Sequence, residues 1–225
     1  EEEKEAIRKG KEFYEKCKEG KNTYNLESPD KKVEMKGVHI DGESLGSGIS
    51  TTVVDASVEE CAAHEFAGLN SRTKIKKRKE HRVSDVLVEH INSHSIYFFS
   101  TRDLGIPGLA LREFRTKVTW LKKTVDGKDV VWIVIKSTND LQDEHPVKSG
   151  HVVASVHTFW VFEELDRKNK IPQTRVTMQS QVNLHSPIPI VIMNRLGARI
   201  LAATSVLRKL LDKSREIEAF DRQKT

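Results

Sequence analysis

The sequence predicts an α+β domain in which a long C-terminal helix closes over a curved antiparallel sheet. A strand-like run at residues 174–183 leads through a proline-bearing turn at 185–189 (HSPIP) into an apolar stretch from Ile190 to about Ala219. That stretch repeats apolar residues at helical spacing, as in Ile192, Leu196, Ile200, Ala203, Leu207 and Leu210. At ~1.5 Å per residue such a helix would be roughly 45 Å long, enough to cross a whole sheet.

The N-terminal part of the chain reads as a charged helix, three strands and a second helix. The helix covers residues 1–19 and ends at Gly20, a residue type that favours helix ends. Alternating residues predict strands at 24–26, 33–40 and 44–54. Ser57 and Glu60 have the spacing of a capping box, so the second helix begins at Ser57 and runs to about Ala67.

The rest of the chain reads as a meander of strands joined by short turns. Strands are expected at 85–91, 94–100, 111–122, 130–136, 150–163 and 174–183. Asp126–Gly127 marks a two-residue hairpin, and residues 166–171 (DRKNKI) mark another. These turns favour an antiparallel sheet in one domain at 21–219, preceded by the charged helix at 1–20 and followed by a tail at 220–225.

Composition narrows the class of protein. No apolar run approaches the eighteen residues of a membrane span, and the acidic start lacks the apolar core of a signal peptide. Cys17 and Cys61 are too few for a disulfide framework and are read as free thiols of a reducing compartment. We therefore expect a cytoplasmic domain of a larger protein, able to lie peripheral to a membrane.

The strand alternation assigns one set of side chains to the face beneath the long helix. On the strand at 174–183, Val176, Met178, Ser180 and Val182 share a side. On its two predecessors, Val131, Ile133 and Ile135 share a side, as do Val152, Ala154, Val156 and Thr158. This face is apolar with few ionisable groups. Periodicity alone favours an ordinary filled core over a ligand cavity.

Five segments form an ordered series: residues 48–58 (GISTTVVDASV), 112–114 (REF), 137–150, 160–163 (WVFE) and 174–182 with the following turn and helix. Taken together, they resemble the START domain, the steroidogenic-acute-regulatory-protein-related lipid-transfer family. Three features depart from the family pattern. Glu113 replaces an aspartate, a basic run at 72–79 replaces a Trp-Asp pair, and residues 141–144 are inserted.

The resemblance implies a helix-grip fold that holds one lipid or sterol-like ligand in a tunnel, without enzymatic chemistry and without a cofactor. It implies release by movement of the final helix and of the loop before residues 112–114, with transient membrane contact. The expected ligand-binding residues are Phe98, Ile106, Leu109, Val131, Ile133, Ile135, Val152, Ala154, Val156, Thr158, Val176, Met178, Ser180, Val182, Met193, Leu196 and Ile200. On the final helix, Arg195, Arg199, Arg208 and Lys209 should reach solvent.

Two segments allow a membrane role beside a plain structural one. The loop at 104–109 (LGIPGL) displays three aliphatic residues, which either fold into the core or form a gate that touches a bilayer. The basic run at 72–82 reads as a solvated segment or as a contact for anionic headgroups. It lacks the interleaved aromatic residues of a nucleic-acid binder, so no nucleic acid is expected.

The sequence contains no motif that indicates enzymatic, nucleotide-binding or metal-binding chemistry. No GxSxG, GxGxxG or P-loop occurs, and the nine histidines lack HExxH or CxxC spacing, so no catalytic residue and no metal site are expected. Two alternatives to lipid binding stay open. One is a helix-grip enzyme, cyclase-like, acting on a hydrophobic substrate; the other is an interaction domain with a filled cavity.

Overall fold

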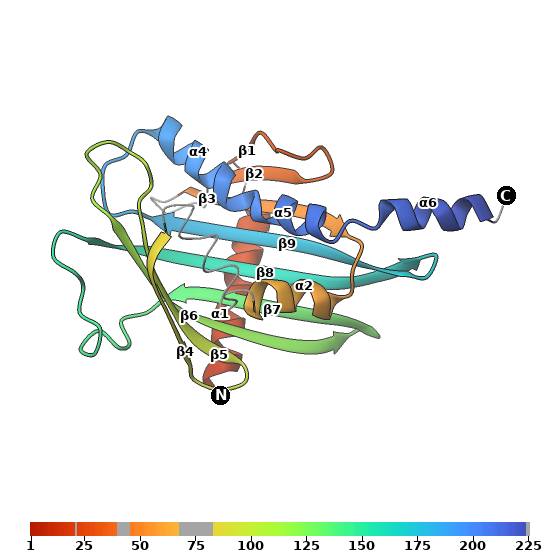
Figure 1. Cartoon of the computed structure of the whole chain (residues 1–225), viewed down its shortest axis with the longest axis horizontal. Helices are drawn as coiled ribbons and strands as arrows, with labels where there is room; N and C mark the ends of the chain where they lie inside the picture. The colour runs from red at the N-terminus through yellow and green to blue at the C-terminus, as the bar shows by residue number, and fades with distance from the viewer. Residues whose placement is uncertain (21, 40–45, 68–82, 224–225) are drawn as a thin grey trace.

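The computed structural model describes residues 1–20, 22–39, 46–67 and 83–223 (Figure 1). Within these ranges the chain forms one nine-stranded sheet in the order β1-β2-β3-β9-β8-β7-β6-β5-β4. The strands are β1 Asn22–Asn25, β2 Glu34–His39, β3 Gly46–Val54, β4 Val83–His90, β5 Ser95–Arg102, β6 Arg112–Val125, β7 Lys128–Ser137, β8 Val152–Lys168 and β9 Ile171–Asn183. The predicted α+β class and antiparallel sheet are confirmed.

Neighbouring strands are antiparallel, and one further pairing is parallel. Residues 112–114 of β6 pair with residues 152–154 of β8, because β7 ends at Ser137 and leaves the start of β8 without its antiparallel neighbour. The predicted hairpin at Asp126–Gly127 is confirmed, and both residues have positive φ, 50° and 77°, as a type I′ turn requires.

Helix α1 (Glu2–Glu19) lies on the outer face of the sheet, behind the strands in Figure 1. Its buried stripe of Ile7, Phe13 and Cys17 packs against a strand face that includes Trp132, Val134 and Phe159. Gly10 permits the close approach, since a Cβ there would lie 2.6 Å from a ring carbon of Phe159. The helix ends at Glu19, as the sequence predicts.

Helices α2 (Val58–Phe66), α4 (Ile190–Leu201) and α5 (Ala203–Leu210) cover the inner face of the sheet, in front of the strands in Figure 1. Helix α2 packs on β7, β8 and β9, whereas α4 lies over β2, β3 and β9. The capping box is confirmed: the Ser57 hydroxyl accepts from the Glu60 N–H, and the Glu60 carboxylate accepts from the Ser57 N–H.

The predicted long C-terminal helical region is confirmed, with interruptions at Ala202 and after Leu210. Ala202 separates α4 from α5, although the Ala202 N–H still donates to the Ala198 carbonyl and the Val206 N–H to the Ala202 carbonyl. The Thr204 hydroxyl donates to the carbonyl of Leu201 at this point, 2.9 Å away. After Leu210 the chain leaves the helix, and the Asp55 carboxylate accepts the Lys213 N–H at 2.9 Å. Helix α6 (Ser214–Gln223) then runs beyond the sheet and spans the predicted boundary at 219.

Candidate ligand-binding site

The strand register arranges the predicted site residues in rows across the inner face. One row joins Ile133, Trp160, Met178 and Ser50, and the next joins Ile135, Thr158, Ser180 and Gly48. Val156 pairs with Val182 in the row after that, and Ala154 and Val152 continue toward the start of β8. The predicted face assignment of these strands is therefore confirmed.

One end of this face is a filled core. Phe98, Val131, Ile133, Val176 and Met178 are buried in one cluster with Leu207 of α5 and residues of α2. Trp160 and Phe162 stack in the same cluster, with ring centroids 5.7 Å apart and planes 4° apart. The five predicted site residues here have close neighbours on all sides and serve the packing between sheet and helices.

The other end of the face is apolar but only half buried. Ile135, Val152, Val156 and Val182 on the strands are all partly accessible, although Ala154 between them is buried. On α4, which lies over β2, β3 and β9, Met193, Leu196 and Ile200 are half buried as well. Ile135 and Ile200 also pack against the filled core. We refer to the region formed by these eight residues, on β7–β9 and α4, as the groove.

Hydroxyl groups mark the boundary between the filled core and the groove. The side chains of Thr158 and Ser180 are hydrogen-bonded to each other at 2.8 Å, and both residues are buried. Ser50, in the row next to Ser180, is fully buried, and its hydroxyl has no hydrogen-bond partner among the described residues. A buried hydroxyl without a partner costs about 1–3 kcal/mol. An uncharged polar group at this boundary would offset that cost.

Arg112 lies beside Val152, at the end of the groove that is farther from the filled core. Its guanidinium donates to the Leu184 carbonyl at 2.9 Å, to the Ser186 hydroxyl at 2.6 Å and to the Ala110 carbonyl at 2.5 Å. The residue is 1% exposed, and burial lowers the pKa of its guanidinium below the ordinary value. The side chain therefore joins the start of β6 to the residues that precede α4.

The 103–111 loop, which contains the predicted gate, lies directly before Arg112. A turn with Pro107 and Gly108 at its centre is closed by the Leu109 N–H and the Ile106 carbonyl, and Gly108 has a φ of 76°. The aliphatic residues of the loop, Leu104, Ile106 and Leu109, are half buried. The structure thus places them neither in the core nor fully in solvent.

An ionic cluster on the outer face holds the loop that joins β7 to β8. The Glu113 carboxylate accepts from Arg115 at 3.0 Å, contacts His151 Nδ1 at 2.9 Å and accepts the Lys148 N–H at 2.9 Å. Burial acts to raise the pKa of Glu113, but these hydrogen bonds together hold it below its usual value. Glu113, at the predicted family position, therefore has a structural role in this chain.

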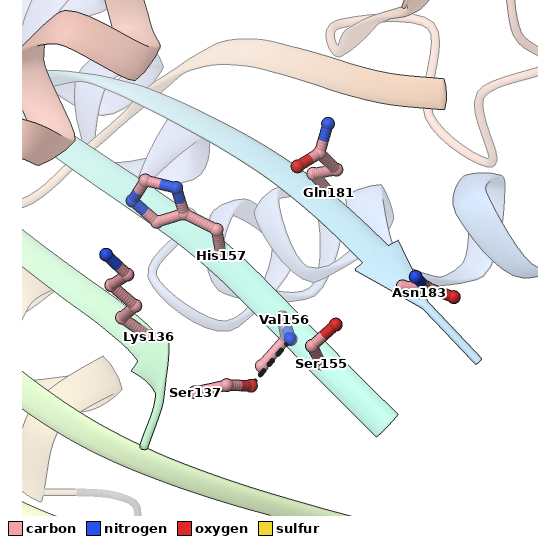
Figure 2. Close-up of a pocket in the computed structure, with 7 residues that line it drawn as sticks. All are labelled: Lys136, Ser137, Ser155, Val156, His157, Gln181 and Asn183. Atoms are coloured by element: carbon pink, nitrogen blue, oxygen red, sulfur yellow. Dashed lines mark hydrogen bonds between the residues drawn. The ribbon is translucent and has the colours of Figure 1, made fainter. Parts of the chain in front are cut away.

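A separate hollow of about 240 Å³ opens where β7 leaves β8 (Figure 2). There the Ser137 hydroxyl accepts the N–H of Val156 at 2.8 Å, in place of a strand partner. The lining residues are polar apart from Val156: Lys136, Ser137, Ser155, His157, Gln181 and Asn183. An apolar ligand gains little from such a lining, so this hollow is a poor site for a lipid, although it shares Val156 with the groove.

Metal and thiol chemistry find no support in the part of the chain that the structure describes. No group of three or more His, Cys, Asp or Glu side chains there is placed to ligate a metal ion. Both cysteines are buried, and burial raises the pKa of the Cys61 thiol to about 12.

Among the described helices, none is long and apolar enough to pass through a membrane. The basic run at 72–82 lies outside the described residues.

One prediction about the final helices is wrong. Arg195, Arg199 and Lys209 are exposed as expected, but the Arg208 side chain is only 12% exposed. It pairs with Asp30 in the turn before β2, with Nε and Oδ2 2.6 Å apart. Arg208 directly follows the buried Leu207, but its contact with Asp30, 178 residues away along the chain, has no signal in the sequence.

Comparisons with known proteins identify the fold of this chain. No protein-family model matches the chain, and no curated protein matches its sequence. Human StAR-related lipid transfer protein 5 superposes with a TM-score of 0.65 at 12% identity, covering 92% of this chain and 97% of that one. The human StarD13 (DLC2) lipid transfer and protein localization domain gives 0.63 at 16% identity, with the same coverage. A STAR-related lipid transfer protein fragment from Xanthomonas axonopodis gives 0.57 at 14% identity, covering 84% and 98%. The chain therefore has the START-domain fold over most of its length.

Proposed function

We propose that this chain binds one lipid or other hydrophobic molecule in the groove and carries or senses it without catalysing a reaction. The observation that carries the proposal is the pair of half-buried apolar surfaces, one on β7–β9 and one on α4. Each buried aliphatic side chain contributes roughly 1.5–3 kcal/mol, so a guest that fills the space between them gains substantial free energy.

The polar groups around the groove favour an uncharged ligand end. At the inner-face positions of residues 133–135, 152–158 and 178–182, the described chain carries hydroxyls and no carboxylate or imidazole. The Arg112 charge is already engaged by three neutral oxygens. A sterol, fatty alcohol or acylglycerol therefore fits better than a lipid whose charged headgroup lies inside. The same residues offer no acid–base pair for the alternative of a helix-grip enzyme.

The wider setting of this function follows from the same proposal. We place the protein in the cytoplasm as a domain of a larger chain that touches membranes transiently, with residues 21–219 as the binding unit. The 103–111 loop is the proposed point of contact, because its three half-buried aliphatic side chains can lose their remaining contact with water against an apolar partner.

Native mass spectrometry of protein purified from cells tests the binding. We expect a co-purified lipid, and binding of a sterol in a panel that also contains a fatty acid and a phosphatidylcholine. Leu196→Gln should reduce retention, whereas the matched change Arg199→Gln on the exposed side of α4 should not. Absence of any bound lipid, together with no binding across the panel, would favour an interaction domain with a filled interior.

Transfer between liposomes tests the role of the loop. The double change Ile106→Ser and Leu109→Ser should slow transfer while it changes the melting temperature little, since both side chains are only half buried. A large loss of stability with normal transfer per folded molecule would instead assign these side chains to the core.

A further inference from the structure

We propose that the polar hollow where β7 leaves β8 is a binding site of its own, on the face of the sheet opposite to the groove, and that it takes a phosphate-type oxyanion. Alternation places Lys136, His157 and Gln181 on the face that carries α1, in one row across β7, β8 and β9. Ser155 and Asn183 form the next row. Figure 2 shows these five side chains around the hollow, whose volume is about 240 Å³.

Helix α1 borders this hollow but does not fill it. Val134, two residues before Lys136, and Phe159, two residues after His157, are buried in the cluster that contains the apolar stripe of α1. Phe13 of α1 stacks on the His157 ring, with ring centroids 4.5 Å apart and planes 23° apart. Beyond His157 the helix covers no more of this face, so the polar side chains there remain open to a ligand from solution.

The charge of the lining favours an anion. Among the described residues that line the hollow, Lys136 carries the only permanent charge, and none is a carboxylate. Lys117 lies opposite Lys136 in the register of β6 and β7, and its ammonium group pairs with Glu2 of α1 at 2.5 Å. Lys136 has no such acid partner in the part of the chain that the structure describes. A negative ligand would therefore meet a cation that is not already paired, in a chain whose formal net charge is +5.

Two neutral groups at the hollow offer donors because their acceptor atoms are already in use. The Ser137 hydroxyl accepts the Val156 N–H at 2.8 Å, so its own hydrogen can point to a ligand. The Asn183 side-chain oxygen accepts the His185 N–H at 2.8 Å, which leaves the amide hydrogens as donors. The Lys136 ammonium group adds three more N–H donors. A ligand that only accepts hydrogen bonds suits this combination.

A phosphate or phosphomonoester group meets these requirements better than a carboxylate does. A phosphomonoester carries nearly two negative charges and three acceptor oxygens, so separate oxygens can accept from Lys136 on β7 and from Asn183 on β9. A carboxylate has one charge and two oxygens in a plane. One water molecule needs only ~10–15 Å³ of such space, so a hollow of about 240 Å³ has room for the phosphate group and for its substituent.

Titration of the full chain with sodium phosphate at constant ionic strength, followed by two-dimensional NMR of isotope-labelled protein, tests the site without any lipid. We expect saturable shifts of the Ser137, Val156 and Asn183 amide signals, larger with phosphate than with acetate at equal concentration. Lys136→Gln should weaken the apparent phosphate affinity about three- to tenfold, since it removes the charge from an exposed position. Asn183→Asp should weaken it about tenfold or more, because it keeps the oxygen that accepts from His185 but places a negative charge in the hollow.

Lys123→Gln is the matched control. Lys123 is exposed on β6 and pairs in register with Val130, near the other end of β7. The substitution removes the same charge outside the hollow, so the phosphate affinity should change less than about twofold, because solvent and salt screen a distant exposed charge.

Vesicles of phosphatidylcholine, with or without phosphatidic acid, distinguish a soluble ligand from a lipid headgroup. Weaker binding of Lys136→Gln to the vesicles with phosphatidic acid, relative to Lys123→Gln, would assign the phosphate to a headgroup. Equal vesicle binding by the two variants, together with weaker binding of free phosphate by Lys136→Gln, would assign it to a ligand in solution.

Two results of the phosphate titration would overturn the proposal. One is the absence of saturable shifts at the Ser137, Val156 and Asn183 amides of the wild-type protein. The other is a phosphate affinity that Lys136→Gln and Lys123→Gln lower equally or leave unchanged, because binding would then reflect net charge or another site. The titration contains no lipid, so neither result bears on the proposed function of the groove.

Discussion

Truncation of two leucines on consecutive helices separates the filled core from the groove. Leu207 on α5 is fully buried in the core cluster, whereas Leu196 on α4 is half buried over the groove. Leu207→Ala should lower the free energy of unfolding by about 2–5 kcal/mol, because it leaves a cavity in packed surroundings. Leu196→Ala removes side-chain atoms that are only partly withdrawn from water, so its cost should be about 1 kcal/mol.

Urea unfolding of delipidated protein, followed by far-ultraviolet circular dichroism, measures both costs under one condition. The dependence of unfolding free energy on urea should be the same for the two variants, so that the midpoints report stability directly. Leu196→Ala should also retain less lipid, whereas the folded fraction of Leu207→Ala should retain the wild-type amount. Equal losses of stability near 3 kcal/mol would refute the division, because α4 would then be packed as tightly as α5.

Three further changes test individual contacts. Asp30→Asn should destabilise the protein by about 3 kcal/mol at neutral pH, since it leaves the largely buried Arg208 side chain without its carboxylate. Burial raises the pKa of Asp30, but its hydrogen bonds from Lys32 and Arg208 bring it below the usual value, so the wild-type advantage should disappear as pH falls below about 4 in acid-unfolding curves. Ser57→Ala should cost about 0.5–2 kcal/mol in thermal or urea unfolding through loss of the cap on α2. Gly10→Ala should cost about 1–3 kcal/mol, because its Cβ meets Phe159 and Val134, and limited proteolysis should detect a loosened α1.

Local patterns were sufficient to predict most of the fold. Alternation placed Val131, Ile133 and Ile135 on one side of their strand, because successive side chains of a strand must point to opposite faces. Ser57 with Glu60 and Asp126 with Gly127 marked a helix start and a hairpin for equally local reasons. Each of these predictions depends only on interactions between residues a few positions apart, so the sequence alone was enough to make them.

The interruptions within the C-terminal helix and the burial of Arg208 could not be predicted in this way. Ala202 and Leu211 are ordinary helix residues, and after Leu211 the Asp55 carboxylate accepts the backbone N–H of Lys213. Asp55 lies 158 residues away from Lys213. Such contacts depend on which elements, far apart in the sequence, pack against each other in the folded chain. A single sequence does not show which elements these are.

For the site, alternation predicted the correct face but not the division along it. Val176 and Val182 lie on the same side of β9, yet the first is buried in the core and the second is half exposed. The difference depends on which helix lies above each row, and that is a tertiary property. Arg112 was placed near the loop by the sequence, but its three partners come from the loop and from residues 184–186, and only the folded chain brings them together.

The unequal burial also determines how a ligand would act on the protein. The apolar stripes of α1 and α2 are buried against the sheet, as is Leu207 of α5, so the docking of these helices needs no guest. The apolar face of α4 is covered only in part, so α4 without ligand lacks contacts that the other helices have. The proposed lipid would supply those contacts only when α4 is closed, and it would therefore stabilise the closed state in proportion to its occupancy.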